Sequence, residues 1–294
     1  MATASVPKKP RLSPLRYPGG KAGLFPLLRS VIRSNLTPRC NYVEPYAGGA
    51  GAALALLIHG EVSAIVINDL DPNINAFWHA VIYENEWFVE AISQVDLSIE
   101  EWRRQREVLR HPASVSLRDL GFATFYLNRT NRSGVLNGGP IGGLNQQDSY
   151  SISARFNRSN LVDRCRLIGR FAPRITIRSS NGKEVIAEFK TDRSSFIYAD
   201  PPYFEKAPGL YLNSFTLADH TDLAEVLNCA AESFWLLTYD DVGQVHELYC
   251  DRRIARYPLH YSAHSPRNVF ELMIVSDALN VHDPAILQLF PSFG

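Results

Sequence analysis

Apolar residues fall into short runs and spaced patterns that predict alternating strands and helices. The stretch NYVEPYAGGAGAALALLIHG (residues 41–60) reads as a strand, a glycine-rich turn and a helix rich in Ala and Leu. A second strand, VSAIVIND (62–69), and a segment with helical spacing, PNINAFWHAVI (72–82), follow it. This order is typical of a parallel sheet with crossover helices.

The alternation is broken between residues 95 and 180. This region includes NRTNRSGVLNGGPIGGLNQQDSYS (128–151), a long polar stretch with five glycines. Loops of this length in compact proteins are usually functional or disordered. The alternation resumes with SSFIYADPPY (194–203) and continues through helices near 219–231 and 242–249 and strands near 233–241, 253–261 and 268–276. We therefore expect an α/β domain built from both chain ends and interrupted by an insertion.

The composition narrows the class of protein. No apolar run is long enough to span a membrane, and the start of the chain lacks the apolar stretch of a secretory signal. The four cysteines, at 40, 165, 229 and 250, form no close pair, and the eight histidines show no metal-binding spacing. We expect a reduced, cytoplasmic protein without a metal site.

The net charge is zero, but its distribution is uneven. Residues 1–43 hold eight Lys or Arg and no acid, whereas residues 44–101 hold ten acids and no Lys or Arg. Residues 102–178 hold fourteen arginines against four acids. Two basic blocks within a neutral chain favour a one-sided surface for a polyanion, and arginine suits phosphate and base-edge contacts. A solvated charged face is the alternative.

The glycine-rich turn EPYAGGAG (44–51) follows a strand and opens a helix. Its glycines allow a sharp turn and close approach of a ligand, and Asp69, at the end of the next strand, could bind the hydroxyls of a ribose. Glu44 beside the turn would repel a pyrophosphate but would suit a cationic ligand. This combination favours S-adenosylmethionine over NAD.

The run FIYADPPYFE (196–205) is a buried strand that stops at an acid and two prolines. Because proline cannot donate to a sheet ladder, the strand must end at Ala199 or Asp200. The rigid turn after it would hold a carboxylate, a carbonyl and an aromatic ring in fixed mutual positions.

Five motifs occur in an order that resembles one family. They are RYPGGK (16–21), EPYAGGAG (44–51), NDLD (68–71), FYLNRT (125–130) and DPPY (200–203). The set resembles the Dam-type, DPPY-bearing DNA adenine methyltransferases in the alpha arrangement, over most of residues 12–276. The resemblance implies a class I Rossmann-like methyltransferase sheet, S-adenosylmethionine as methyl donor, and the 6-amino group of adenine in double-stranded DNA as acceptor.

The resemblance also implies roles for individual residues and segments. The family's cofactor-lining positions correspond to Tyr17, Lys21, Gly48, Gly49, Gly51 and Asp69. We add Glu44, because of its charge beside the turn, and Asp200 as further cofactor-binding candidates. The catalytic wall corresponds to Asp200, Pro201, Pro202 and Tyr203, and candidate DNA contacts are Asn128, Arg129, Arg132, Arg155 and Arg158. We expect a flexible basic N-terminus (1–11), a catalytic domain (12–90 and 180–294) and a target-recognition insertion (91–179).

The chemistry expected at DPPY is direct transfer to a flipped base. Asp200 and the Pro201 carbonyl would each accept an amino hydrogen, and Tyr203 would stack on the base. Tyr17 stands where the family often has Trp. The segment 138–143 does not match the recognition hairpin of GATC-specific members, so the target site stays open.

Several alternatives remain at this stage. An adenine in RNA would present the same groups to the site as an adenine in DNA once it is flipped out. A catalytically silent DNA-binding regulator could also keep the fold, although intact Lys21, Asp69 and Asp200 speak against it. Enzymes that methylate protein glutamine typically have Asn at the position of Asp200. An NAD-dependent oxidoreductase would give the DPPY motif no role. We expect a monomer; whether a cognate restriction endonuclease accompanies it stays open.

Overall fold

The computed structural model describes residues 12–17, 20–37, 39–204, 215–258, 270–282 and 284–289. The expected flexible N-terminus, residues 1–11, lies outside this range, as do Pro18 and Gly19 of the RYPGGK motif. Among the helices that the described ranges contain, none has the length and apolar character needed to cross a bilayer.

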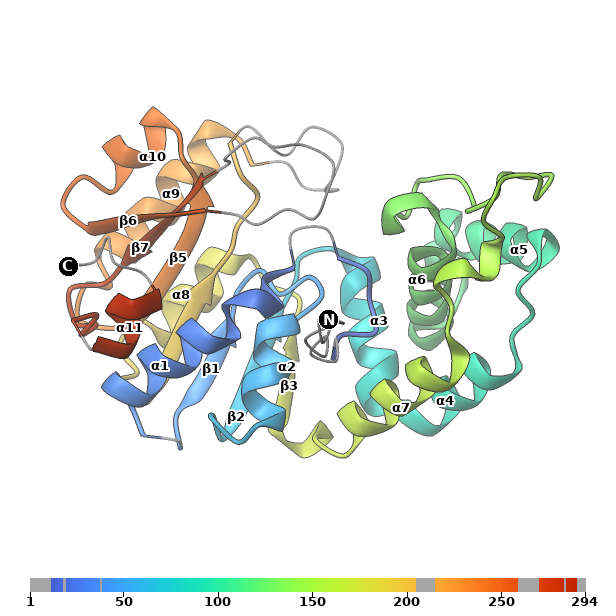
Figure 1. Cartoon of the computed structure of the whole chain (residues 1–294), viewed down its shortest axis with the longest axis horizontal. Coiled ribbons are helices and arrows are strands. Elements are labelled where there is room, and N and C mark those ends of the chain that lie inside the picture. Colours follow the sequence, from blue (N-terminus) through green and yellow to red (C-terminus); the bar gives the residue numbers. More distant parts are fainter. Residues whose placement is uncertain are drawn as a thin grey trace, which may run out of the picture.

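A seven-stranded sheet forms the centre of the molecule, with the strand order β3-β2-β1-β4-β5-β7-β6 (Figure 1). The strands are β1 (Asn41–Glu44), β2 (Ala64–Asn68), β3 (Ile175–Arg178), β4 (Ser195–Ala199), β5 (Phe234–Asp240), β6 (Arg253–Pro258) and β7 (Phe270–Val275). Strands β1 to β5 are parallel, and β7 runs antiparallel between β5 and β6. The predicted α/β, Rossmann-like sheet is confirmed, as is the end of β4 at Ala199.

Both faces of the sheet are covered, so its central strands are apolar on both sides. On one face Val43, Ile197 and Leu237 pack against α8 (Gly182–Phe189), α9 (Leu217–Asn228) and α10 (Gly243–Leu248). On the other face Tyr42 and Phe196 join a core with α1 (Phe25–Asn35), α2 (Gly51–Ile58) and α11 (Pro284–Leu289).

The strand order reverses between β1 and β4, which are neighbours in the sheet. At such a point the crossover connections diverge and leave a crevice at the carboxyl ends of the strands, where ligands bind in open α/β sheets. The loops after β1 and β4 carry the glycine turn and DPPY. The fold therefore brings the two motifs to opposite sides of one crevice.

A second group of helices, which we call the helical lobe, stands beside the sheet (Figure 1). It consists of α3 (Pro72–Tyr83), α4 (Asn85–Gln94), α5 (Ile99–Arg110), α6 (Leu117–Thr130) and α7 (Arg158–Gly169). Helix α3 packs against α6, and α4 packs against α7. The approach of α3 to α6 is close, because a Cβ at Gly121 would lie 2.2 Å from the carbonyl oxygen of Ala76. Helix α3 precedes residue 91, where the insertion was expected to begin, and α4 spans that residue. In space both helices nevertheless pack with α6 and α7 of the expected insertion.

Candidate active site

Four acidic residues lie at the carboxyl ends of the parallel strands. Glu44 ends β1, Asp69 follows β2, Asp200 follows β4 and Asp240 ends β5. Because carboxyl ends of parallel strands share one edge of the sheet, these side chains line the crevice at the switch point.

The two oxygens of the Asp200 carboxylate have different surroundings. Oδ1 accepts hydrogen bonds from Thr238 Oγ1 at 2.7 Å and from the Tyr203 hydroxyl at 3.0 Å, and the Lys21 ammonium lies 3.2 Å away. None of the described residues donates to Oδ2, and the side chain keeps 22% exposure. The carboxylate is therefore fixed through one oxygen, and the other is open to an incoming donor.

Lys21 reaches this carboxylate from a 3₁₀ turn (Lys21–Leu24) that precedes α1. Its ammonium also contacts the Tyr203 hydroxyl at 2.6 Å and Glu271 Oε2, on β7, at 3.0 Å. Burial works to lower the pKa of Lys21, but the charges of Asp200 and Glu271 outweigh it and raise the pKa. The amine is thus a charged group of the β4–β5 side of the crevice, which we call the catalytic half. The cofactor-lining role implied by the resemblance stays a prediction.

The ionisation of Asp200 and Tyr203 follows from this arrangement. Burial raises the pKa of Asp200, the Lys21 ammonium opposes that rise, and the Glu271 charge adds to it. Burial, with the charges of Asp200 and Glu271, also raises the pKa of Tyr203 well above its ordinary value, so the phenol remains a donor to Asp200.

The DPPY segment follows β4 and is fixed at its far end. Pro201 is buried, and the N–H of Phe204 donates to Asp240 Oδ1 at 3.2 Å. The Phe204 ring stacks on His220 with 3.6 Å between centroids. Asp240 therefore holds the end of the motif to β5. The acceptor role of the Pro201 carbonyl stays a prediction.

The glycine turn (residues 45–50, between β1 and α2) is held by side chains from three elements. The Gly48 N–H donates to Asp69 Oδ2 at 2.8 Å, and Trp78 Nε1 on α3 donates to the Gly48 carbonyl at 2.9 Å. Gly48 has a φ of +47°, and a Cβ there would lie 2.5 Å from the Tyr17 ring. Glycine is thus required by the backbone conformation and by the ring that covers the turn.

Gly49 and Gly51 belong to the same covered surface. A Cβ at Gly49 would lie 2.9 Å from Tyr17 Cβ, and one at Gly51 would lie 3.2 Å from Ala22 Cβ. The segment that contains Tyr17 and Lys21 therefore lies over the glycine turn and the start of α2. Burial raises the pKa of Asp69 to about 6, while the backbone N–H groups of Asp71 and Gly48 oppose that rise.

Glu44 is a buried carboxylate without a cationic partner among the described residues. It is 5% exposed, and Oε1 accepts a hydrogen bond from the Tyr42 hydroxyl at 3.0 Å. Oε2 is buried and has no hydrogen-bond partner within the described part of the chain. Burial raises the pKa of Glu44 to about 8, and the charge of Asp200 contributes to the rise. An orphaned buried oxygen beside a glycine turn fits a ligand that brings a cationic donor, as S-adenosylmethionine does.

Comparisons with known proteins identify the family of this chain. Residues 17–264 match the family model of D12 class N6 adenine-specific DNA methyltransferases. The chain belongs to this family. The type II methyltransferase M.MjaIII of Methanocaldococcus jannaschii is 24% identical over 225 residues, which cover 71% of this chain and 74% of that protein. The structure of the rRNA methyltransferase AviRa from Streptomyces viridochromogenes aligns over 96% of this chain and 94% of that one, with a TM-score of 0.37 and 11% identity.

Membership of the D12 class identifies the reaction and the donor. The protein is an adenine-specific DNA methyltransferase that uses S-adenosylmethionine, and its sheet is the class I Rossmann-like methyltransferase sheet expected from the sequence.

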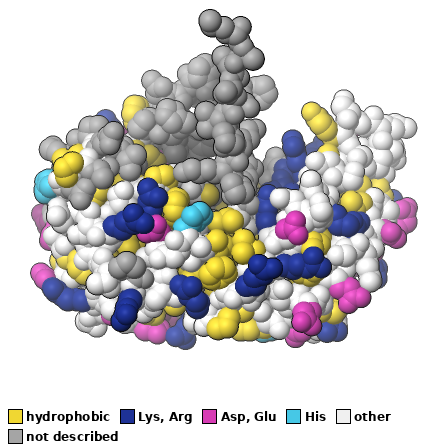
Figure 2. Space-filling model, turned by 60° about the horizontal axis from the view of Figure 1, so that its bottom comes forward, with side chains coloured by type: hydrophobic (Ala, Val, Ile, Leu, Met, Phe, Trp, Pro, Cys, Tyr) yellow, Lys and Arg dark blue, Asp and Glu magenta, His cyan; other side chains and the backbone are white. Residues whose placement is uncertain are grey.

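The candidate DNA contacts of the D12-class chain divide into exposed and buried groups. Arg132 and Arg155 are exposed, and Arg132 forms an ion pair with Asp148 at 2.7 Å. Arg129 is half-buried and reaches the backbone carbonyl of Arg155. Figure 2 shows basic side chains on the helical lobe, including the side that turns toward the rest of the molecule.

Asn128 and Arg158 have partners within the protein that speak against a direct contact with DNA. Asn128 is 4% exposed, and its amide accepts from the backbone N–H of Arg16 and donates to the carbonyls of Arg16 and Gly134. Arg158 donates to the carbonyls of Ile92 and Val95 at the end of α4. We therefore assign Asn128 to holding the N-terminal segment and Arg158 to capping a helix.

Several residues of the site were missed by the sequence reasoning, among them Glu271, Trp78, Arg16 and Thr238. Glu271 interrupts the apolar run FELMIV, which was the available signal, since an acid in a buried strand needs a partner. Trp78 carried no signal apart from apolar spacing. For Arg16, burial and then the nearby Arg155 guanidinium lower the pKa. Two guanidinium groups close enough to repel would suit a phosphate.

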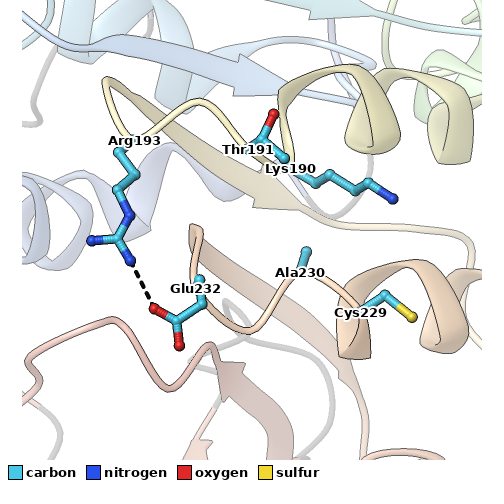
Figure 3. A pocket seen from close by; sticks show the side chains of 6 residues that line it. All are labelled: Lys190, Thr191, Arg193, Cys229, Ala230 and Glu232. Carbon is cyan, nitrogen blue, oxygen red and sulfur yellow. Dashed lines mark hydrogen bonds and ion pairs between the residues drawn. The ribbon is translucent and has the colours of Figure 1, made fainter.

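A shallow cavity at the opposite, amino-terminal edge of the sheet is not the candidate site. It lies between the loops that precede β4 and β5, and the ion pair of Arg193 with Glu232, at 2.7 Å, lies at its wall (Figure 3). Its lining residues are Lys190, Thr191, Arg193, Cys229, Ala230 and Glu232. Ligands of doubly wound sheets bind at the carboxyl edge instead.

Proposed function

We propose that this D12-class methyltransferase acts at a specific sequence of double-stranded DNA, on an adenine flipped out of the helix, and transfers the methyl group directly. The single observation that carries the catalytic assignment is Asp200 at the switch point, where three protein groups fix Oδ1 and none of the described residues donates to Oδ2. Flipping is required because the 6-amino group lies inside the duplex.

Asp200 Oδ2 accepts one hydrogen of the target amino group, and the carbonyl of Pro201 accepts the other. These two bonds direct the nitrogen lone pair away from the ring and toward the methyl donor. The Tyr203 hydroxyl can stay bound to Asp200 Oδ1 when the base enters, because the target amino group uses Oδ2. Its ring stacks on the base, a contact worth about 1–3 kcal/mol in related systems. Fixed groups of this kind need little reorganisation in the transition state.

The β1–β2 half of the crevice holds the cofactor. When bound, S-adenosylmethionine supplies a methyl group activated by its sulfonium. Glu44 Oε2 accepts a hydrogen bond from a cationic group of this ligand, which satisfies the oxygen that lacks a partner among the described residues. Asp69 binds the ribose hydroxyls, and Tyr17 covers the glycine turn that borders the ligand.

Asp200 also handles the proton of the reaction. The nitrogen that gains the methyl group becomes cationic, and the surplus proton passes from it to Oδ2. The raised pKa of Asp200 supports this role, because a more basic carboxylate is a better acceptor.

On the DNA side, Arg132 and Arg155 contact phosphates or base edges, and a monomer suffices because one strand is methylated at a time. The type II name of the relative from Methanocaldococcus jannaschii supports a companion restriction endonuclease as a further proposal. Because its substrate is DNA, we place the enzyme in the cytoplasm.

The test is nucleoside mass spectrometry on methyl-free duplex DNA, single-stranded DNA and RNA, incubated with S-adenosylmethionine and either wild type or Asp200→Ala. We expect 6-methyladenine in the duplex with wild type alone, and sequencing then gives the target. Methylation of RNA with none in DNA would overturn the duplex assignment. Equal activity of Asp200→Ala would overturn the catalytic one.

A further inference from the structure

Glu271 is a buried acid that the reaction described above does not use. It lies on β7, is 2% exposed and pairs in register with Asp240 of β5. Two carboxylates directly opposite each other on neighbouring strands destabilise a sheet, and a buried acid needs a charged or hydrogen-bonding partner. This placement points to a role in the site beyond the stability of the sheet.

The partners of Glu271 belong to the catalytic half. Its Oε2 lies 3.0 Å from the Lys21 ammonium and accepts a hydrogen bond from the Tyr257 hydroxyl. The same ammonium lies 3.2 Å from Asp200 Oδ1. One cation is therefore shared by two carboxylates, and the three groups together carry a net charge of minus one.

The shared cation has a consequence for Asp200. If Lys21 paired with Asp200 alone, the ammonium would neutralise the carboxylate and weaken it as a hydrogen-bond acceptor and base. With Glu271 on its other side, part of the ammonium's interaction is taken by the second carboxylate. Both effects of Glu271, its own negative charge and its hold on Lys21, make Asp200 more basic.

We propose that Glu271 is a positioning residue for methyl transfer, which holds Lys21 between two carboxylates and so keeps Asp200 basic enough to accept hydrogen from the target amino group. This inference rests on the proposed function of Asp200. The other titratable groups that face the pair in the described residues are Tyr42, Glu44, Tyr198, Tyr203, Tyr239, Asp240 and Tyr257.

The experiment follows the Asp200 carboxyl by carbon-13 NMR in protein labelled at the aspartate carboxyl, with Asp200→Asn to assign the signal. In Glu271→Gln the titration midpoint of Asp200 should fall by about one pH unit or more, because a negative charge is lost and Lys21 is left to Asp200. Lys21→Gln should move the midpoint in the opposite direction. Such opposite shifts would not arise from a general loss of stability.

The matched control is Glu61→Gln. Glu61 is also a buried carboxylate in an ion pair, with Arg33 at 2.7 Å, but it lies just before β2, at the opposite edge of the sheet. Its loss should lower stability and leave the Asp200 titration unchanged. If Glu271→Gln does not fold, Glu271→Asp keeps the charge but draws it back from Lys21, and a smaller shift in the same direction is expected.

Turnover is measured on the same proteins. Glu271→Gln should lower kcat about tenfold, move the acidic limb of the kcat–pH profile to lower pH, and leave the KM for the cofactor unchanged. Glu271→Asp should restore part of the midpoint and of kcat. An Asp200 midpoint equal to that of wild type in Glu271→Gln overturns the inference. Absence of 6-methyladenine with wild type overturns the proposed function instead, whereas the NMR result alone decides whether Glu271 controls the basicity of Asp200.

Discussion

Glu44 ends β1 and Asp200 follows the neighbouring strand β4, yet the protein surrounds the two carboxylates with different partners. Among the described residues Glu44 has the Tyr42 hydroxyl and the backbone N–H of Ala53 beside it, and no cation. Asp200 has Lys21, Tyr203 and Thr238 on one oxygen, with Glu271 beyond the ammonium. The sequence shows the same contrast. Glu44 lies in a block without Lys or Arg, residues 44–101, whereas the cation beside Asp200 is Lys21, from the basic block of residues 1–43.

The difference reflects what each carboxylate meets. A carboxylate that receives a cationic ligand gains most if the protein leaves it without a cation, and the cost of burying it is offset on binding. A carboxylate that receives a neutral amino group must stay ionised and fixed while empty, so it needs its own donors on one oxygen. The cofactor half is thus completed by its ligand, whereas the catalytic half is complete beforehand.

Asp200→Asn should have the largest effect, because it removes the charge and keeps the shape. We expect kcat to fall about 10²- to 10³-fold while the Kd for S-adenosylmethionine changes less than threefold. The 6-methyladenine formed per minute at saturating cofactor, measured by mass spectrometry, gives the first quantity and calorimetry the second. A large loss of cofactor affinity would mean that Asp200 belongs to the cofactor half.

Glu44→Gln should weaken cofactor binding about tenfold to a hundredfold with little change in kcat. With a pKa of about 8, Glu44 is mostly protonated at pH 7 in the free protein, and a cationic ligand lowers that pKa. Wild type should therefore release a proton on binding, and its affinity should rise as pH increases toward 8.

Calorimetry in buffers of different ionisation enthalpy measures that proton. Tyr42→Phe is the control, since it keeps the carboxylate and removes its hydroxyl partner. Proton release of equal size in Glu44→Gln would show that another group titrates.

Gly48→Ala should lower the free energy of unfolding by about 1–3 kcal/mol and weaken cofactor binding, because of the positive φ and the 2.5 Å approach of the Tyr17 ring. Gly23→Ala, where an added Cβ meets nothing within 4 Å, is the control and should be neutral or slightly stabilising. Urea unfolding with and without cofactor measures both. Equal stabilities would mean that the turn adapts.

The smallest effect is expected at the DNA side. Arg132→Ala should weaken DNA binding a few-fold and reduce the salt dependence of log K by about one unit, because a phosphate contact releases one counterion. Arg158→Ala should leave that slope unchanged and lower stability, since its guanidinium caps α4. Fluorescence anisotropy over a salt series separates the two. A changed slope in Arg158→Ala would contradict our assignment.

Much of the sheet could be predicted from local patterns. Strands β1, β2, β4 and β5 are short apolar runs, and Asp200-Pro201-Pro202 had to stop β4. The carboxyl-edge positions of Glu44, Asp69 and Asp200 follow from parallel topology alone.

Contacts between distant segments could not be predicted in this way. Lys21 and Glu271 are 250 residues apart and meet only because β7 inserts beside β5. Asn128 looked like a DNA contact by type and position, but its amide joins the N-terminal segment to Gly134. The packing of the helices in the helical lobe depends on close contacts such as that between Gly121 and Ala76, and no periodic pattern in the sequence predicts such contacts.

The most direct test of this division is a titration of the single-turnover methylation rate against S-adenosylmethionine for wild type, Asp200→Asn and Glu44→Gln. We predict that Asp200→Asn lowers the rate at saturation and keeps the half-saturating concentration, and that Glu44→Gln does the reverse. If both variants change both quantities by similar factors, the two carboxylates act as one unit and the division of the crevice into a cofactor half and a catalytic half is wrong.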